Sequence, residues 1–190
     1  MSPPFTARLS SRDSSQTETS NAEVPTSEQL LGQWYMTASS SGFWQEKHSA
    51  CLTYQASTAT PGALDDVTTF FLASATQPST TKGVNSPSAA GPGIYDWRGS
   101  GWLRMIKTSW EVVGWGALEN GKDEDELVLV TLAQKTMFSS RALSIYWRKK
   151  DGMDAEKIQA VAAALKALGD ADLTSDVDKL RAIQQTWVAE

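Results

Sequence analysis

The side chains best suited to chemistry in this chain are aromatic rings that end in a hydrogen-bonding group. Eight tryptophans and four tyrosines stand among the 190 residues, and the single histidine and the single cysteine are His48 and Cys51. Tyrosine and tryptophan combine a flat apolar face with one polar tip, which suits them to stack on planar molecules. No Gly-x-Ser-x-Gly elbow, phosphate loop, dinucleotide glycine fingerprint or His-Glu-x-x-His motif occurs in the sequence. This composition favours binding of a hydrophobic small molecule.

The overall composition excludes several classes of protein. At 41% hydrophobic and 21% charged residues, the chain can form a packed core, and no apolar run reaches the ~18 residues of a membrane helix. A net charge of −5 argues against nucleic acid as the main partner. One cysteine and one histidine rule out a disulfide framework, a paired-cysteine zinc site and a histidine cluster. We therefore predict no metal, no cofactor, no nucleic-acid partner and no membrane span, and leave the oligomeric state open.

The first 27 residues differ in composition from the rest. Eleven of these 27 residues are serine or threonine, and no charged start followed by an apolar core marks a secretory signal. Such a segment buries too little apolar surface to offset its ordering entropy. We predict a disordered tail over residues 1–27, a folded domain over residues 28–190 and a cytoplasmic location, or secretion if a leader has been removed. A lid or an organelle address is the alternative role for the tail.

Eight short segments with strand character follow at nearly regular spacing. They are residues 31–38, 48–54, 67–73, 81–84, 95–107, 109–115, 126–136 and 142–149. Short strands at such spacing, rich in β-branched and aromatic residues, predict an all-β sandwich or barrel.

The period of the apolar residues changes after the last strand. Asp154 is suited to cap a helix whose apolar residues recur at helical spacing until Gly169. Its single apolar stripe predicts that this helix packs on the outside of the sheet. Thr174 or Ser175 is expected to cap a second, shorter helix that extends towards Trp187.

Three features together resemble the lipocalins. Gly32-Gln33-Trp34 opens the first strand, Arg148 ends the last one, and a helix follows. The resemblance implies an eight-stranded antiparallel barrel with a C-terminal helix, in which Trp34 closes the floor and Arg148 packs across it. A guanidinium stacks well on an indole face. The Thr-Asp-x-Tyr turn, the disulfide and the signal peptide of secreted members are not evident, which argues against extracellular transport.

A narrower resemblance rests on residues 93–103 (GIYDWRGSGWL) and 110–116 (WEVVGWG). These segments are similar to small intracellular lipocalin-like proteins of filamentous fungi. Some of those proteins are natural-product pericyclases that join a quinone methide to a terpene olefin in a hetero-Diels–Alder step. The resemblance implies a cofactor-independent cyclase of secondary metabolism. A non-catalytic carrier of a hydrophobic metabolite is the alternative, and a structural barrel with a protein partner is a third possibility.

Side-chain alternation along the strands predicts which residues face the interior. Glu111 is polar and expected outside, so Trp110, Val112 and Gly114 are expected inside. With Trp34 in the floor, Met36 and Ala38 point inward. For residues 67–73 the odd-numbered face is favoured as the inner one, which makes Phe71 a wall residue. The predicted ligand-binding residues are Met36, Trp44, Phe71, Tyr95, Trp97, Trp110 and Val112.

The predicted catalytic groups are hydrogen-bond donors. A pericyclic reaction needs two reacting ends held close, aromatic faces to stack on and a donor to a carbonyl oxygen. His48, Tyr54 and Tyr146 are the expected donors. The alternative for His48 is a solvent-facing loop position, and Cys51 is expected to be a small buried hydrophobe. For any single aromatic residue, ordinary core packing is the alternative.

Overall fold

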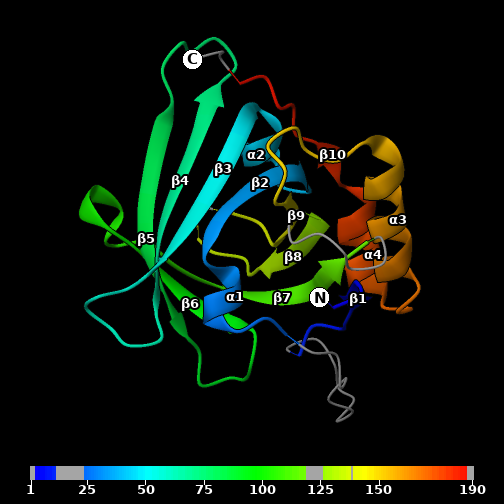
Figure 1. Cartoon of the computed structure of the whole chain (residues 1–190), viewed down its shortest axis with the longest axis horizontal. Helices are drawn as coiled ribbons and strands as arrows, with labels where there is room; N and C mark the ends of the chain where they lie inside the picture. Colours follow the sequence, from blue (N-terminus) through cyan, green and yellow to red (C-terminus); the bar gives the residue numbers. More distant parts are fainter. Residues whose placement is uncertain (1–2, 12–23, 119–125, 138, 188–190) are drawn as a thin grey trace.

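The computed structural model describes residues 3–11, 24–118, 126–137 and 139–187. Within them, eight antiparallel strands follow one another around a closed barrel, because β7 pairs with both β6 and β8. Their bounds are β2 Gly32–Ser39, β3 Lys47–Ala56, β4 Leu64–Leu72, β5 Ser79–Pro87, β6 Ile94–Gly99, β7 Lys107–Ala117, β8 Leu127–Ala133 and β9 Ala142–Trp147. The predicted eight-stranded, lipocalin-like barrel is confirmed (Figure 1).

Two C-terminal helices pack on one flank of the barrel (Figure 1). They are α3 (Ala155–Lys166) and α4 (Ala171–Asp178). Asp154 caps α3 as predicted, since its side chain accepts a hydrogen bond from the Lys157 amide at 2.8 Å. The predicted start and length of the second helix are wrong, because Asp170 caps α4 instead. No described helix is long and apolar enough to cross a membrane.

The chain beyond α4 returns to the barrel instead of continuing as a helix. The short strand β10 (Arg181–Ala182) pairs with β2, and Ile183 then joins the interior cluster of the barrel. The predicted fifth strand, residues 95–107, is also shorter than expected. After β6 it turns through the 3-10 helix η1 (Gly101–Leu103) before β7 begins.

One end of the barrel is closed by the predicted floor pair. The Arg148 guanidinium lies 3.7 Å from the centre of the Trp34 ring and donates hydrogen bonds to the Gln29 and Gln33 carbonyls. The Trp34 indole N–H donates to the Leu30 carbonyl at 2.8 Å, at the end of α1 (Ser27–Leu30). The predicted roles of Trp34 and Arg148 in the floor are therefore confirmed.

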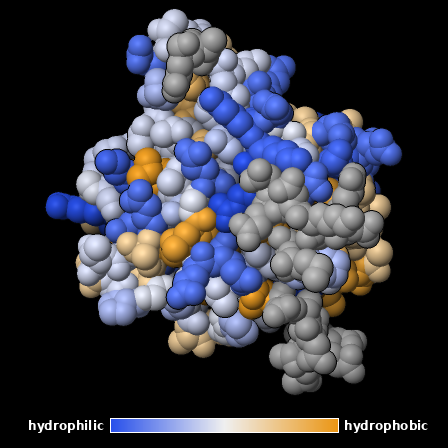
Figure 2. All heavy atoms as spheres, viewed as in Figure 1, coloured by the Kyte–Doolittle hydropathy of each residue, from blue (hydrophilic) through white to orange (hydrophobic). Residues whose placement is uncertain are grey.

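The loops at the other end surround the mouth of the barrel. They join β2 to β3, β4 to β5, β6 to β7 and β8 to β9, and the first of them contains α2 (Gly42–Gln45). In Figure 1 α2 lies in the upper part of the view and α1 in the lower part. On the face shown in Figure 2, the surface is mainly hydrophilic, with hydrophobic residues between. This agrees with strands that turn their apolar faces away from solvent.

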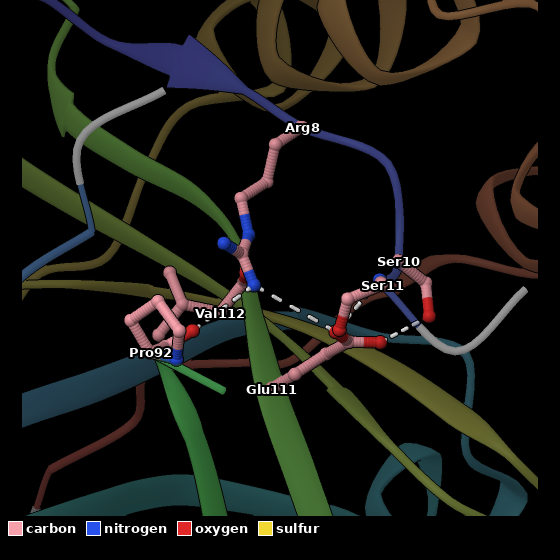
Figure 3. A network of polar contacts seen from close by, with 6 residues as sticks. All are labelled: Arg8, Ser10, Ser11, Pro92, Glu111 and Val112. Carbon is pink, nitrogen blue, oxygen red and sulfur yellow. Dashed lines mark hydrogen bonds and ion pairs between the residues drawn. The ribbon is translucent and has the colours of Figure 1, made fainter. Parts of the chain in front are cut away.

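The start of the chain differs from the disordered tail expected for residues 1–27. The strand β1 (Thr6–Ala7) pairs antiparallel with β7. Beyond it, Arg8 and Ser10 are buried against the barrel, where they contact Glu111 (Figure 3). Residues 12–23 of the predicted tail lie outside the described part of the chain. The long-range contacts of Arg8 and Ser10 explain why low apolar content did not prevent order here.

Two irregularities in strand pairing overturn parts of the predicted alternation. The register shifts between Met36 and Ala38, so Met36 stays inside while Ala38 packs in the outer cluster. A second shift follows Val112, and Gly114 consequently faces Phe5 on the outside. Predicting Ala38 and Gly114 as interior residues was wrong, because a β-bulge reverses the faces of the residues beyond it.

Candidate functional site: the barrel cavity

A cavity of about 250 Å³ opens from the mouth into the barrel. Its wall combines five aromatic side chains with hydroxyl, amide and carboxyl groups. The lining residues are Trp44, Leu52, Tyr54, Asp66, Thr68, Thr81, Asn85, Trp97, Leu103, Thr108, Trp110, Thr131, Ala133, Ala142, Ser144 and Tyr146. Mostly apolar walls with a few convergent polar groups are typical of small-molecule sites.

Two of the lining rings, Tyr54 and Trp110, belong to an aromatic stack that continues into the core at Tyr95. The rings of Tyr95 and Trp110 are 4.6 Å apart between centroids, and those of Tyr54 and Trp110 are 6.1 Å apart, both nearly parallel. The Trp110 indole is held in place because its N–H donates to the Asn85 side-chain oxygen at 2.7 Å. Rings from three strands therefore hold Trp110 in a fixed orientation in the cavity wall.

A buried carboxyl group, Asp66, lies beside this wall on β4. It accepts hydrogen bonds from the Trp97 indole N–H at 3.0 and 3.2 Å. The Trp97 indole packs directly against Gly83 on its way to Asp66, and a Cβ added to Gly83 would overlap the ring. Burial raises the pKa of Asp66 above its ordinary 3.8, although hydrogen bonds from Trp97, Asn85 and the Gly83 backbone partly offset the effect.

All the side chains that line the cavity are uncharged except Asp66. Its carboxyl therefore meets only neutral donors. A carboxyl group in such a place protonates at a higher pH than an exposed one, and a protonated carboxyl can donate a hydrogen bond. Alternatively, the ionised carboxylate of Asp66 can be stabilised by a ligand that brings a hydrogen-bond donor or a positive charge.

Two buried phenols, Tyr54 and Tyr146, complete the polar part of the cavity. Burial raises the pKa of Tyr146 to about 12, with the Ser144 and Thr131 hydrogen bonds acting in the opposite direction. Burial also raises the pKa of Tyr54 well above its ordinary value, and Asp66 adds to this rise. Both phenols consequently stay protonated at neutral pH and can donate to an oxygen of a bound molecule.

The structure brings five of the ten predicted site residues to the cavity. They are Trp44, Tyr54, Trp97, Trp110 and Tyr146. Met36, Tyr95 and Val112 face the interior as predicted, but they pack in the core cluster rather than lining the cavity. The Tyr95 hydroxyl points away to Ser27 of α1, 3.2 Å distant.

The remaining two predicted site residues, His48 and Phe71, lie on the outer face of the wall. Their rings stack on each other with centroids 5.3 Å apart, and the His48 Nδ1 lies 2.8 Å from the Thr186 hydroxyl. His48 was expected to donate to the ligand, but it lies outside the cavity, because the pairing of β3 and β4 shifts after it, at Ser49 with its positive φ of 50°. For Phe71 the wrong face of β4 was chosen, since Phe70 packs in the interior cluster.

Sequence reasoning missed most of the polar lining, above all Asp66 and Asn85. The inward face of β4 carries Leu64, Asp66, Thr68 and Phe70, and its outward face is just as mixed. Polarity therefore does not distinguish the two faces of this strand. The adjacent pair Asp65-Asp66 was the available signal, because strict alternation must direct one of the two carboxyls inward.

The fold has counterparts among solved structures, at low sequence identity. Lobster apocrustacyanin A1 superposes with a TM-score of 0.57 at 13% identity, over 84% of this chain and 79% of that one. Apocrustacyanin C2 gives 0.59 at 14%, over 86% and 82%. The cockroach allergen Per a 4 gives 0.57 at 12%, over 86% and 94%. No protein-family model matches the chain, and no curated protein matches it either. At this level of identity the similarity establishes the lipocalin-like fold.

Proposed function

We propose that the barrel binds one small, flat and largely apolar molecule that carries a carbonyl or hydroxyl oxygen. The observation that carries this proposal is the pairing of protonated Tyr54 and Tyr146 with the stacked Trp110 ring in one cavity. The ring offers a flat face, and the phenols offer donors in a dry setting, where hydrogen bonds are strong.

We further propose that the protein is a cytoplasmic, cofactor-independent cyclase of fungal secondary metabolism. The reaction is of the hetero-Diels–Alder type, and its substrate is a quinone methide or related enone. A donor to the enone oxygen lowers the barrier as charge develops there, and confinement keeps the reacting ends at near-attack distance. Tyr146 and Tyr54 are assigned as the donors, and Trp110 and Trp97 as the stacking surfaces.

A non-catalytic carrier is the second candidate, and the size of the cavity favours it. About 250 Å³ lies just below the 300–1,000 Å³ of ordinary drug-sized sites. A single small molecule fits such a volume, whereas two joined reactants would extend through the mouth past Trp44 and Leu103. The two candidates share the same pocket and differ in whether a product forms faster.

Parallel measurements of affinity and turnover separate the candidates. The wild type, Tyr146→Phe and the outer-face control Phe71→Leu are each mixed with a quinone-methide precursor and a terpene olefin. Adduct is quantified by mass spectrometry, and affinity for the planar probe 2-naphthol is measured by tryptophan quenching.

A cyclase forms adduct above the protein-free rate, and Tyr146→Phe lowers that rate more than it lowers affinity. A carrier gives no such acceleration, and its Tyr146→Phe variant loses affinity alone. If 2-naphthol and the precursors leave the tryptophan emission of the wild type unchanged, the proposal of a ligand cavity is wrong.

A further inference from the structure

The large apolar side chains that remain exposed all gather at the open end of the barrel. Among the described residues they are Phe43, Leu72, Trp102, Met105 and Met137, with exposed fractions of 53, 45, 83, 81 and 91%. Three of the four loops at that end contribute at least one of them, and Leu72 ends β4 directly before the remaining loop. Exposed apolar residues scattered singly are ordinary, whereas their concentration in one place marks an interaction site.

The four loops and the strand ends beside them form a ring of segments around the cavity mouth. The Ser40 amide donates to the Leu143 carbonyl at 2.8 Å, which joins the first loop to the start of β9, just after the last loop. The Thr108 hydroxyl donates to the Gln134 carbonyl, and Lys47 pairs with Leu72. We call this ring the open rim and define it as residues 40–47, 72–79, 100–107, 134–137 and 139–141.

The open rim is positively charged, although the whole chain is negative. It carries five cationic residues against the single carboxylate Glu46, while the net charge of the chain is −5. The cations are Lys47, Arg104, Lys107, Lys135 and Arg141, of which Arg141 forms an ion pair with Asp176 of α4 at 2.8 Å. Arg104, Lys107 and Lys135 are exposed and form no ion pair with any described residue. Positive charge and exposed apolar tips therefore share one end of the molecule.

We propose that the open rim docks on the surface of a lipid bilayer that contains anionic lipids. Anionic headgroups attract exposed lysine and arginine residues, and tryptophan prefers the boundary between headgroups and acyl chains. Trp102 and Met105 protrude from one loop and Met137 from another, so they enter a deformable surface as separate tips. A protein partner would instead require a contiguous, closely complementary patch.

Docking in this orientation turns the cavity mouth towards the membrane. An apolar molecule could then move between the bilayer and the cavity past Trp44 and Leu103 without crossing water. This consequence rests on the proposed ligand binding, whereas the docking itself rests only on the open rim. A failure of ligand binding and a failure of docking are therefore distinguishable.

Vesicle flotation with the full chain tests the docking. Vesicles of phosphatidylcholine alone are compared with vesicles containing about 30% phosphatidylserine. We expect binding to the anionic vesicles that weakens at high salt. Lys107→Ala/Lys135→Ala should lower the partition coefficient about fivefold for each cation removed. Trp102→Ser/Met105→Ser should lower it more than tenfold, and the control Lys150→Ala, at the closed end, should leave it unchanged.

A fluorescent label reports the orientation independently of the substitutions that weaken binding. The environment-sensitive dye NBD is attached at Met105→Cys or, as a control at the closed end, at Ala59→Cys, both in a Cys51→Ala background. Anionic vesicles should shift the emission of the dye at position 105 to the blue and leave position 59 unchanged.

Three results would overturn the proposal. They are no binding to either vesicle, equal binding by Trp102→Ser/Met105→Ser, and equal shifts at both label positions. Self-association that depends on Trp102 in the absence of any vesicle binding would assign the open rim to a protein contact instead. Circular dichroism and thermal melting confirm that each variant is folded, which is expected because the altered rim side chains are exposed.

Discussion

Two carboxyl groups are buried on opposite faces of the barrel wall, and their partners differ in kind. Glu111, on the outside of β7, is fully buried and has a cation nearby, since Arg8 lies 3.7 Å away. Ser10 and Ser11 also donate hydrogen bonds to it (Figure 3). Asp66, on the inside of β4, is 9% exposed and receives hydrogen bonds from neutral groups alone.

The difference separates a carboxylate balanced by a cation from a carboxyl group held by neutral donors alone. The outer carboxylate has its charge balanced and its oxygens occupied, so it fixes the N-terminal segment to the barrel. The inner carboxyl retains the cost of burial, as the raised pKa of Asp66 indicates. Carboxyl groups whose pKa is raised by burial occur often at binding sites, and a ligand can supply the positive charge that the cavity of this fold does not.

The largest effect is expected when the outer carboxylate loses its cation. Arg8→Ala leaves Glu111 buried and uncompensated, and breaking a buried pair in this way costs about 3–5 kcal/mol of unfolding free energy. Arg8 also donates to the Val112 carbonyl at 2.7 Å, and that contact is lost with it. Urea unfolding followed by tryptophan fluorescence measures the loss.

The double variant Arg8→Ala/Glu111→Gln is the control for this prediction. Removing both charges should recover part of the lost stability, because the penalty arises from the unpaired carboxylate. A loss below about 1 kcal/mol in Arg8→Ala would mean that the N-terminal segment does not hold Glu111 as described. Neither Glu111 nor Asp66 would then depend on a cation for its contribution to stability.

The second largest effect is expected at Gly83, which lets Trp97 reach the inner carboxyl. An alanine there overlaps the Trp97 indole, so the ring must move away from Asp66. Overpacking together with the lost hydrogen bond should cost about 1–3 kcal/mol. Gly42→Ala is the matched control, because an added Cβ there meets no atom within 4 Å. Equal melting temperatures for the two variants would contradict the assigned path of the indole.

Comparing Glu111 with Asp66 also shows which structural features could be predicted from the sequence. Periodicity predicted the strands and the helix capped by Asp154, and the lipocalin resemblance predicted the contact of Trp34 with Arg148. These features depend on local spacing or on a motif. Glu111 was correctly expected outside, but its complete burial was not, because that burial depends on Arg8, about a hundred residues away in the chain.

The parts that could not be predicted share a physical cause. Ala38, His48 and Gly114 changed faces at β-bulges, whose position follows from how neighbouring strands pair rather than from any one strand. Asp66 is stabilised inside by Trp97 and Asn85, which come from two other strands. Side-chain alternation predicts the orientation of such residues only when the pairing of the neighbouring strands is already known.

A smaller effect on stability, and a larger one on binding, is expected at Tyr146. Tyr146→Phe removes one buried hydroxyl and its hydrogen bonds with Ser144 and Thr131, which should cost about 0.5–1.5 kcal/mol. Affinity for 2-naphthol should fall roughly tenfold, because the ligand loses its donor. Isothermal titration and thermal melting measure the two quantities. Unchanged affinity would remove Tyr146 from the polar part of the cavity, and Phe71→Leu serves as the control on the outer face.

The smallest expected effect is a change in the pH dependence of stability, and it tests the inner carboxyl directly. The pKa of Asp66 is raised in the folded state, so the folded protein retains the proton at pH values where the unfolded chain has released it. Folding stability therefore falls as pH rises from about 3.8 through the raised pKa, and it is constant above that pKa. Asp66→Asn does not titrate, so its unfolding free energy should decline less over this window than that of the wild type. Denaturant unfolding in steps of half a pH unit measures both curves. Parallel curves would mean that Asp66 titrates as an exposed carboxyl does. Asp66 and Glu111 would then differ in their hydrogen-bond and charge partners, but burial of Asp66 would carry no cost in folding free energy.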